Sequence, residues 1–247
     1  MKKPYIKVLV YVTVAILISI LILLFLFPDM SQTLINTVPE YPPEISTIDA
    51  NEILITNAVT IDKSNVRDII SAMNRPEEYY SETQGVITHN TGSSSFTRKK
   101  WVRGSLSRVD VLSDAQRTTA HYIYTDDKVY IFSPQSRTHY TTSRGNFDAD
   151  DTQMMMSYED IIKTPDESIS DAKLTTLDGN SCIWVEAKNP KTGNTTRYWV
   201  ATSTGLLLYG ETLDPDGKTI YTFTVRQTDV SPQSADIFKL PDGTYPT

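Results

Sequence analysis

From Gly85 onward the chain alternates apolar and polar residues in short runs that are separated by turn residues. Successive side chains of a β-strand point to opposite faces of a sheet, so runs of this kind predict half-buried strands. The connections are too short for crossover helices, which predicts antiparallel neighbours. The predicted strands span residues 85–90, 95–103, 105–112, 117–124, 128–132, 137–142, 172–177, 181–188, 195–202, 206–213 and 219–229.

Two segments have helical spacing instead. Before Pro76, apolar residues recur at i, i+3, i+4 and i+7, and Asp62 is the candidate N-cap. These residues are Val66, Ile69, Ile70 and Met73. A second helix is predicted over residues 151–163, with an apolar face made of Met154, Met155, Tyr158, Ile161 and Ile162. Together the pattern predicts an α+β fold, mostly β: a curved antiparallel sheet or half-barrel of about eleven strands that encloses helices.

The last predicted strand, residues 219–229, alternates most regularly. Its apolar positions are Tyr221, Phe223 and Val225, and its polar positions are Thr222, Thr224 and Arg226. One face of this strand is therefore expected to be buried and the other to face water.

The N-terminal part has a different character. Residues 8–27 contain no charge, no glycine and no proline, and at about 1.5 Å per residue they span roughly 30 Å, the thickness of a bilayer core. Lys2, Lys3 and Lys7 precede the run, which places the N-terminus in the cytoplasm. A cleaved signal peptide is the alternative, but its apolar core is shorter and ends in a small-x-small site, which this chain lacks.

The predicted organisation therefore has four parts. Residues 1–7 are cytoplasmic, 8–27 form a transmembrane anchor, 28–51 form a tether with four prolines, and 52–247 form an extracytoplasmic domain. Fully stretched at about 3.3 Å per residue, the tether would reach roughly 80 Å. The protein is thus predicted to be a single-pass protein of the cell membrane whose domain stays close to that membrane.

Composition limits the partners of the outer part. The chain has 23 basic and 30 acidic residues, and without the three N-terminal lysines the balance is 20 to 30. An acidic domain does not bind nucleic acid nonspecifically, so no nucleic-acid partner is expected. The single cysteine, Cys182, cannot form an intramolecular disulfide, so the domain must be stabilised by its core.

No enzymatic motif is found. His89, His121 and His139 are scattered along the chain, and no third ligand accompanies a pair of them. The sequence contains no nucleophile elbow, no zinc-protease motif and no glycine-rich phosphate loop. Cys182 lies near Trp184 in a predicted strand and is expected to be a small buried side chain. We therefore expect no catalytic residues, no metal and no cofactor.

Several short motifs resemble one superfamily. Residues 197–209 form a Trp-bearing strand that leads into a Thr-Gly-Leu turn, and a Phe-x-Leu-Pro segment follows at residues 238–241. Upstream, the basic strand 98–103 precedes an Arg-x-Asp strand at residues 108–110. In these features residues 61–241 resemble the lipoprotein-carrier superfamily of LolA and the RseB N-terminal domain.

The resemblance implies a half-barrel whose concave apolar face, lidded by helices, holds acyl chains or a protein segment, without catalytic residues. The residues expected to line this cavity are Met154, Met155, Tyr158, Tyr221, Phe223 and Val225. Unbranched methionines can repack around variable apolar ligands, so residues 154–156 are candidates for ligand contact. The favoured interpretation is a plug that only fills the core, because an amphipathic helix that packs on a sheet needs such an apolar face in any case.

A basic cluster stands out against the acidic background. It comprises Arg98, Lys99, Lys100, Arg103 and Arg108. One interpretation is a docking patch for an acidic partner or an anionic wall polymer. The other is the solvated face of two strands, on which lysines discourage edge pairing.

The tether separates the possible functions. A domain on a membrane leash cannot shuttle between two membranes as a soluble carrier does. The first hypothesis is a non-enzymatic envelope protein that binds lipid or lipoprotein acyl chains. The alternative is a protein-interaction module of the GerS type, partner of a cell-wall or spore-cortex amidase in sporulation or germination. An open apolar cavity of several hundred Å³ would favour the first hypothesis, and a filled cavity the second.

Overall fold

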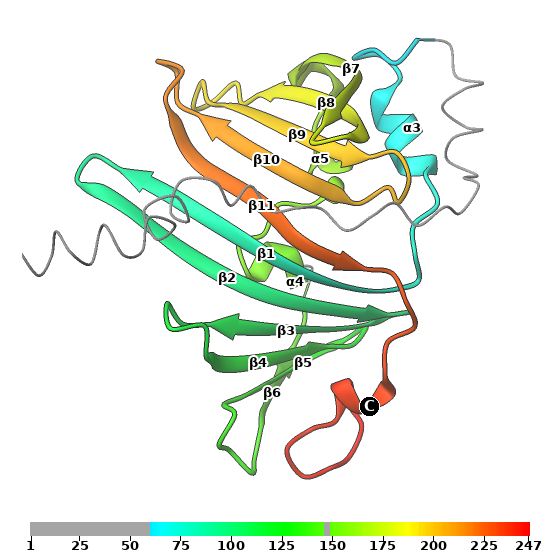
Figure 1. Ribbon diagram of the computed structural model, residues 1–247, viewed down its shortest axis with the longest axis vertical. Helices are drawn as coiled ribbons and strands as arrows, with labels where there is room; N and C mark the ends of the chain where they lie inside the picture. The colour runs from blue at the N-terminus through cyan, green and yellow to red at the C-terminus, as the bar shows by residue number, and fades with distance from the viewer. Residues whose placement is uncertain (1–59, 146–148) are drawn as a thin grey trace, which may run out of the picture. The chain divides into compact units, whose positions relative to one another are not determined.

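The computed structural model describes residues 60–145 and 149–247 and contains one eleven-stranded antiparallel sheet (Figure 1). Its strand order is β6-β5-β4-β3-β2-β1-β11-β10-β9-β8-β7. The last strand, β11, thus lies between β1 and β10 and joins the two meanders in the middle of the sheet. Among the described residues, β6 and β7 are its end strands. The predicted antiparallel, mostly β fold of about eleven strands is confirmed.

The strands lie close to their predicted positions. Their bounds are β1 Glu78–His89, β2 Gly92–Arg103, β3 Leu106–Leu112, β4 Thr118–Tyr124, β5 Lys128–Phe132, β6 Tyr140–Ser143, β7 Ile169–Leu177, β8 Asn180–Lys188, β9 Thr195–Ala201, β10 Leu207–Leu213 and β11 Thr219–Asp229. The main difference is β1, which begins at Glu78 rather than at Gly85. Its first half buries Ser81 and Thr83 instead of apolar residues, so the hydrophobic alternation that signals a strand is missing there.

The first described helix, α3, spans Val66–Ala72 and buries Val66 and Ile70. It begins later than the predicted cap. The Asp62 carboxylate instead accepts a hydrogen bond from the Ser64 backbone N–H at 2.7 Å, in the turn that precedes the helix. Met73 follows directly and is buried as well, so the apolar face predicted from the helical spacing is the face that packs on the sheet.

The single helix predicted over residues 151–163 is wrong. Two short helices, α4 (Ala149–Thr152) and α5 (Tyr158–Lys163), are separated by residues 153–157, which we call the methionine link. Met154 adopts a φ of 55°, which a right-handed helix cannot contain. Ser157 then starts α5 with a capping box, in which its hydroxyl and the Asp160 carboxylate satisfy the first backbone N–H groups.

The two faces of the sheet are covered differently. We call the face that packs against α3, α4 and α5 the inner face, and it holds the main core, including Val109, Val185, Val200 and Phe223. The outer face is covered at β3–β5 by the C-terminal segment, where the 3₁₀ helix η3 (Ala235–Phe238) helps to form a second core. That core contains Ile123, Tyr130, Phe238 and Leu240. A further 3₁₀ turn, η2 (Asp166–Ser168), precedes β7.

Within the described ranges, none of the helices combines the length and the apolar character that crossing a membrane requires. The predicted cytoplasmic segment, anchor and tether, residues 1–51, lie outside those ranges.

Candidate ligand-binding site

The inner face is indented at two glycines that share one row across the sheet. Gly85 of β1 pairs with Phe223 of β11, which pairs with Gly210 of β10. A Cβ atom at Gly85 would lie 2.1 Å from the Phe96 ring, and one at Gly210 would lie 2.5 Å from the Met156 sulfur. A glycine inside a strand often marks such a close approach. The two glycines therefore let Phe96 and Met156 lie directly against the sheet.

The methionine link is held on this face by contacts from two strands. The Tyr221 hydroxyl of β11 donates a hydrogen bond to the Met154 carbonyl at 2.8 Å. The Thr83 hydroxyl of β1 lies 3.5 Å from the sulfur of Met155, which is buried. The Met154 side chain, in contrast, is 59% exposed. The backbone of the link is thus positioned while one large apolar side chain remains in solvent.

An apolar cavity of about 650 Å³, which is shallow and widely open to solvent, lies beside the link. Its apolar walls are Ile87, Met154, Met155, Met156, Ile220 and Tyr221, and Thr88 and Asp150 complete the lining. The volume falls within the range of about 300–1,000 Å³ that is typical of small-molecule sites. Thioether side chains adapt to the shape of an apolar ligand, so this cavity can accept a flexible hydrocarbon chain.

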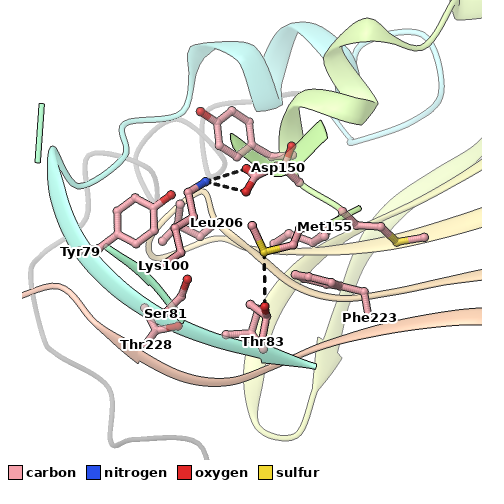
Figure 2. A pocket seen from close by; sticks show the side chains of 14 residues that line it. Tyr79, Ser81, Thr83, Lys100, Asp150, Met155, Leu206, Phe223 and Thr228 are labelled. Carbon is pink, nitrogen blue, oxygen red and sulfur yellow. Dashed lines mark hydrogen bonds and ion pairs between the residues drawn. The ribbon is translucent and has the colours of Figure 1, made fainter. Parts of the chain in front are cut away.

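A second cavity, of about 50 Å³, adjoins Met155 and has a polar end (Figure 2). There the Lys100 ammonium lies 2.7 Å from both oxygens of Asp150, and both side chains are largely buried. Burial disfavours the charged lysine, but the Asp150 carboxylate outweighs this effect and raises the pKa of Lys100. Burial raises the pKa of the neighbouring Tyr79 phenol. This ion pair ties α4 to β2, and the space around it suits water rather than a larger ligand.

The six residues predicted to line a cavity are brought together around these two spaces. Met154, Met155 and Tyr221 line the larger cavity, and Tyr158, Phe223 and Val225 line the smaller one, which Met155 also borders. Met154 and Met155 belong to the methionine link rather than to the helix face that the sequence predicted.

Several residues of the site were not predicted from the sequence. Ile87 and Ile220 lie at strand ends, where alternation is least regular, and line the cavity. Phe96 stacks on Tyr221 with ring centroids 6.3 Å apart. Only Gly85 and Gly210 could have indicated the position of the site in the sequence, because a glycine inside a strand often marks the close approach of another group to the backbone.

The basic cluster does not form one patch. Alternation along β2 places Arg98 and Lys100 on the inner face and Lys99 and Arg103 on the outer face. Four members are paired with carboxylates: Lys99 with Glu82 at 3.5 Å, Lys100 with Asp150, Arg103 with Glu78 at 3.3 Å and Arg108 with Asp110 at 2.8 Å. The geometry therefore favours a structural role for these four cations over a common docking surface.

The residues considered for catalysis are placed apart or buried. His121 lies 2.7 Å from the Asp110 carboxylate and next to Arg108 on the outer face. Burial raises the pKa of the Cys182 thiol to about 11, which disfavours the reactive thiolate. Among the described residues, His, Cys, Asp and Glu do not form a group of three or more that could hold a metal ion.

No family model matches the sequence, and neither does any curated protein. Similar solved structures include an uncharacterized conserved protein from Thermus thermophilus, at TM-score 0.43 and 8% identity, covering 75% of this chain and 90% of that one. MucB is similar at TM-score 0.45 and 13% identity, covering 71% of this chain and 61% of MucB. A LolA superfamily protein from Nitrosomonas europaea is similar at TM-score 0.36 and 10% identity, covering 74% of this chain and 99% of that one.

Proposed function

We propose that this chain is a non-enzymatic binding protein of the cell envelope that holds a lipid or lipoprotein acyl chain in the cavity beside the methionine link. The observation that carries the proposal is the apolar cavity of about 650 Å³, whose wall includes three consecutive methionines. Side chains that filled this space would have left no room for a hydrocarbon chain. The exposed Met154 at its mouth adds apolar surface that a ligand can cover.

The proposal includes a location. We expect residues 8–27 to anchor the protein in the cell membrane with the domain outside the cytoplasm, because lysines precede the apolar run on one side only. N-terminal sequencing of the membrane fraction should then find the intact N-terminus. A mature chain that begins beyond residue 27 and is free in the supernatant would contradict the anchor.

A binding role also suits the charged groups near the cavity. Lys100 and Asp150 neutralise each other in a buried pair, so neither is poised as a free general acid or base. The pair instead fixes the start of α4, from which the methionine link leaves. The groups around the cavity thus provide shape and position rather than a reacting centre.

The test is a titration of the full chain, stabilised in amphipathic polymer, with a fluorescent fatty acid. We expect saturable binding at one site and displacement by unlabelled fatty acid. Gly210→Leu is the matched variant, because its side chain would meet the Met156 sulfur and push the link into the cavity. Signal that never saturates, or that is unchanged in this variant, would contradict binding in the cavity.

The protein-interaction alternative, a module of the GerS type that assists a cell-wall or spore-cortex amidase, has one observation in its favour. The edge strand β6 is exposed at all four of its residues, Tyr140–Ser143. An open edge can pair with an added strand from a partner. Purification of the solubilised full chain, with lipids and proteins both identified by mass spectrometry, separates the two: a stoichiometric amidase without lipid would favour this alternative.

A further inference from the structure

We infer that the cavity selects a single-chain amphiphile with an anionic headgroup, and that the guanidinium of Arg98 binds this headgroup. The inference rests on the proposed function and names the ligand class of the same cavity. The shared headgroup chemistry is a carboxylate or a phosphate, since both match the planar fork of an arginine.

Arg98 is a deeply buried cation on the inner face. It lies on β2 between Phe96 and Lys100, which point to the same side because strand residues alternate. Only 9% of the residue is exposed, and its Cζ lies 4.8 Å from the centre of the Phe96 ring. Most of the Arg98 side chain is therefore covered by the domain, and its Nε is fully buried.

The hydrogen-bonding capacity of Arg98 is largely unused. Among the residues that the structure describes, its Nε has no partner, and its Nη1 donates one hydrogen bond, to the Thr97 carbonyl at 3.0 Å. None of the described carboxylates forms an ion pair with it. Lys100, two residues further along the same face, has Asp150 as its counter-ion. A buried charge without a counter-ion is costly, so an anion that enters from outside would be strongly favoured.

Arg98 does not itself line the cavity, but two of its neighbours contact residues of the cavity wall. The Phe96 ring, over which the guanidinium lies, stacks on Tyr221 of the cavity wall. On the adjacent strand Thr83 is the register partner of Arg98, and Thr83 contacts Met155 of the same wall. A headgroup at Arg98 would therefore leave its hydrocarbon chain running along the methionine link.

The size of the cavity limits the tail. A volume of about 650 Å³ lies in the range of single small-molecule sites and is enough for one acyl chain. The net charge of the chain is negative, so long-range electrostatics do not attract an anion to the domain. Selection of an anionic ligand would therefore depend on the single buried cation rather than on the net charge of the domain.

The experiment compares headgroups on one tail. Hexadecanoate, hexadecanol and hexadecanoyl-lysophosphatidate are titrated into the full chain in amphipathic polymer. We expect at least one anionic probe to bind about tenfold or more tightly than the alcohol, as a charge-assisted hydrogen bond provides. The tighter of the two anions identifies the carboxylate or the phosphate as the headgroup. This comparison uses the unmodified protein, so it does not depend on whether a variant folds.

The variants then assign the selectivity to Arg98. Arg98→Met should remove the preference for the anion and leave the affinity for hexadecanol unchanged, whereas Arg98→Lys should retain part of the preference. Arg103→Met is the control, because Arg103 lies on the outer face of the same strand and is paired with Glu78. Without ligand, Arg98→Met should also raise the melting temperature, since it removes an uncompensated buried charge; a purely structural arginine would lower it.

The outcomes distinguish a failure of the role of Arg98 from a failure of acyl-chain binding. If hexadecanol binds as tightly as both anions, or if Arg98→Met keeps the preference, the role of Arg98 is overturned and acyl-chain binding stands. If none of the three probes binds the unmodified protein, the proposed function and this inference both fall.

Discussion

The two faces of the sheet use arginine in opposite ways. On the outer face, Arg108 pairs with Asp110, hydrogen-bonds the Ile237 carbonyl and lies over the Trp101 ring at 5.7 Å, so the C-terminal segment is fastened over a filled core. On the inner face, Arg98 is buried with an unpartnered Nε among the described residues, beside a cavity. On the outer face, Arg108 finds its partners within the chain. On the inner face, the Nε of Arg98 is left without a partner among the described residues, so an anionic ligand could supply one.

The largest expected effect breaks the inner core itself. Phe223 is 3% exposed on the inner face, so Phe223→Asp should lower the free energy of unfolding by at least about 3 kcal/mol, because it buries an unpaired charge. Thr224→Asp, on the opposite face of the same strand, should cost less than about 1 kcal/mol. Denaturant unfolding of both variants measures the difference. Equal losses would show that the assignment of the two faces is wrong.

The outer face should be the pH-sensitive one. Burial opposes ionisation of Asp110, but hydrogen bonds from His121 and Arg108 outweigh it and hold the pKa of the carboxyl below its usual value near 3.8. A lowered folded-state pKa contributes stability that is present above the unfolded pKa and is lost as the pH falls through the folded one. Stability should therefore fall below about pH 4.

Asp110→Asn tests this contribution. It should lower the free energy of unfolding at pH 7 by about 1–3 kcal/mol, since Arg108 loses its charged partner, and should flatten the acid limb of the pH profile. Asp114→Asn is the control, because Asp114 is exposed in the turn after β3. If the control flattens the profile as much, the acid sensitivity does not arise in the Asp110 cluster.

The two glycines of the inner face should differ in their response to alanine. Gly85→Ala places a methyl group against the rigid Phe96 ring and should cost about 1–3 kcal/mol. Gly210→Ala meets the flexible Met156 side chain, which can move, so it should cost less than about 1 kcal/mol. Thermal unfolding compares them. A larger loss for Gly210→Ala would mean that Met156 is packed as tightly as the ring.

The smallest effect on stability is expected at the mouth of the cavity. Met154→Gln changes an exposed side chain and should alter the free energy of unfolding by less than about 0.5 kcal/mol, while it weakens fatty-acid binding several-fold. Met155→Gln, at a residue that is 5% exposed, should instead cost about 2 kcal/mol or more. A stability loss of several kcal/mol for Met154→Gln would identify the link as a core plug.

Much of the sheet could be predicted from local patterns. Alternation of period two located all eleven strands, and glycines such as Gly179 and Gly217 mark turns where the backbone has a positive φ. β1 was found only in part, because its buried Ser81 and Thr83 are polar. The second helix was predicted as continuous, because its residues satisfy the helical period although Met154 does not adopt a helical conformation.

For the candidate site, too, some features follow from local sequence and others only from the tertiary structure. Local sequence determined which strands form and which residues of β11 face inward, since periodicity depends only on neighbours along the chain. That the methionines lie near them was expected only from the family resemblance. Tertiary structure alone decided that Gly85, Phe223 and Gly210 share a row, that Lys100 meets Asp150 and that Arg98 has no such partner among the described residues. Strand register and the pairing of buried charges depend on residues far apart in sequence, so only the folded chain brings them together.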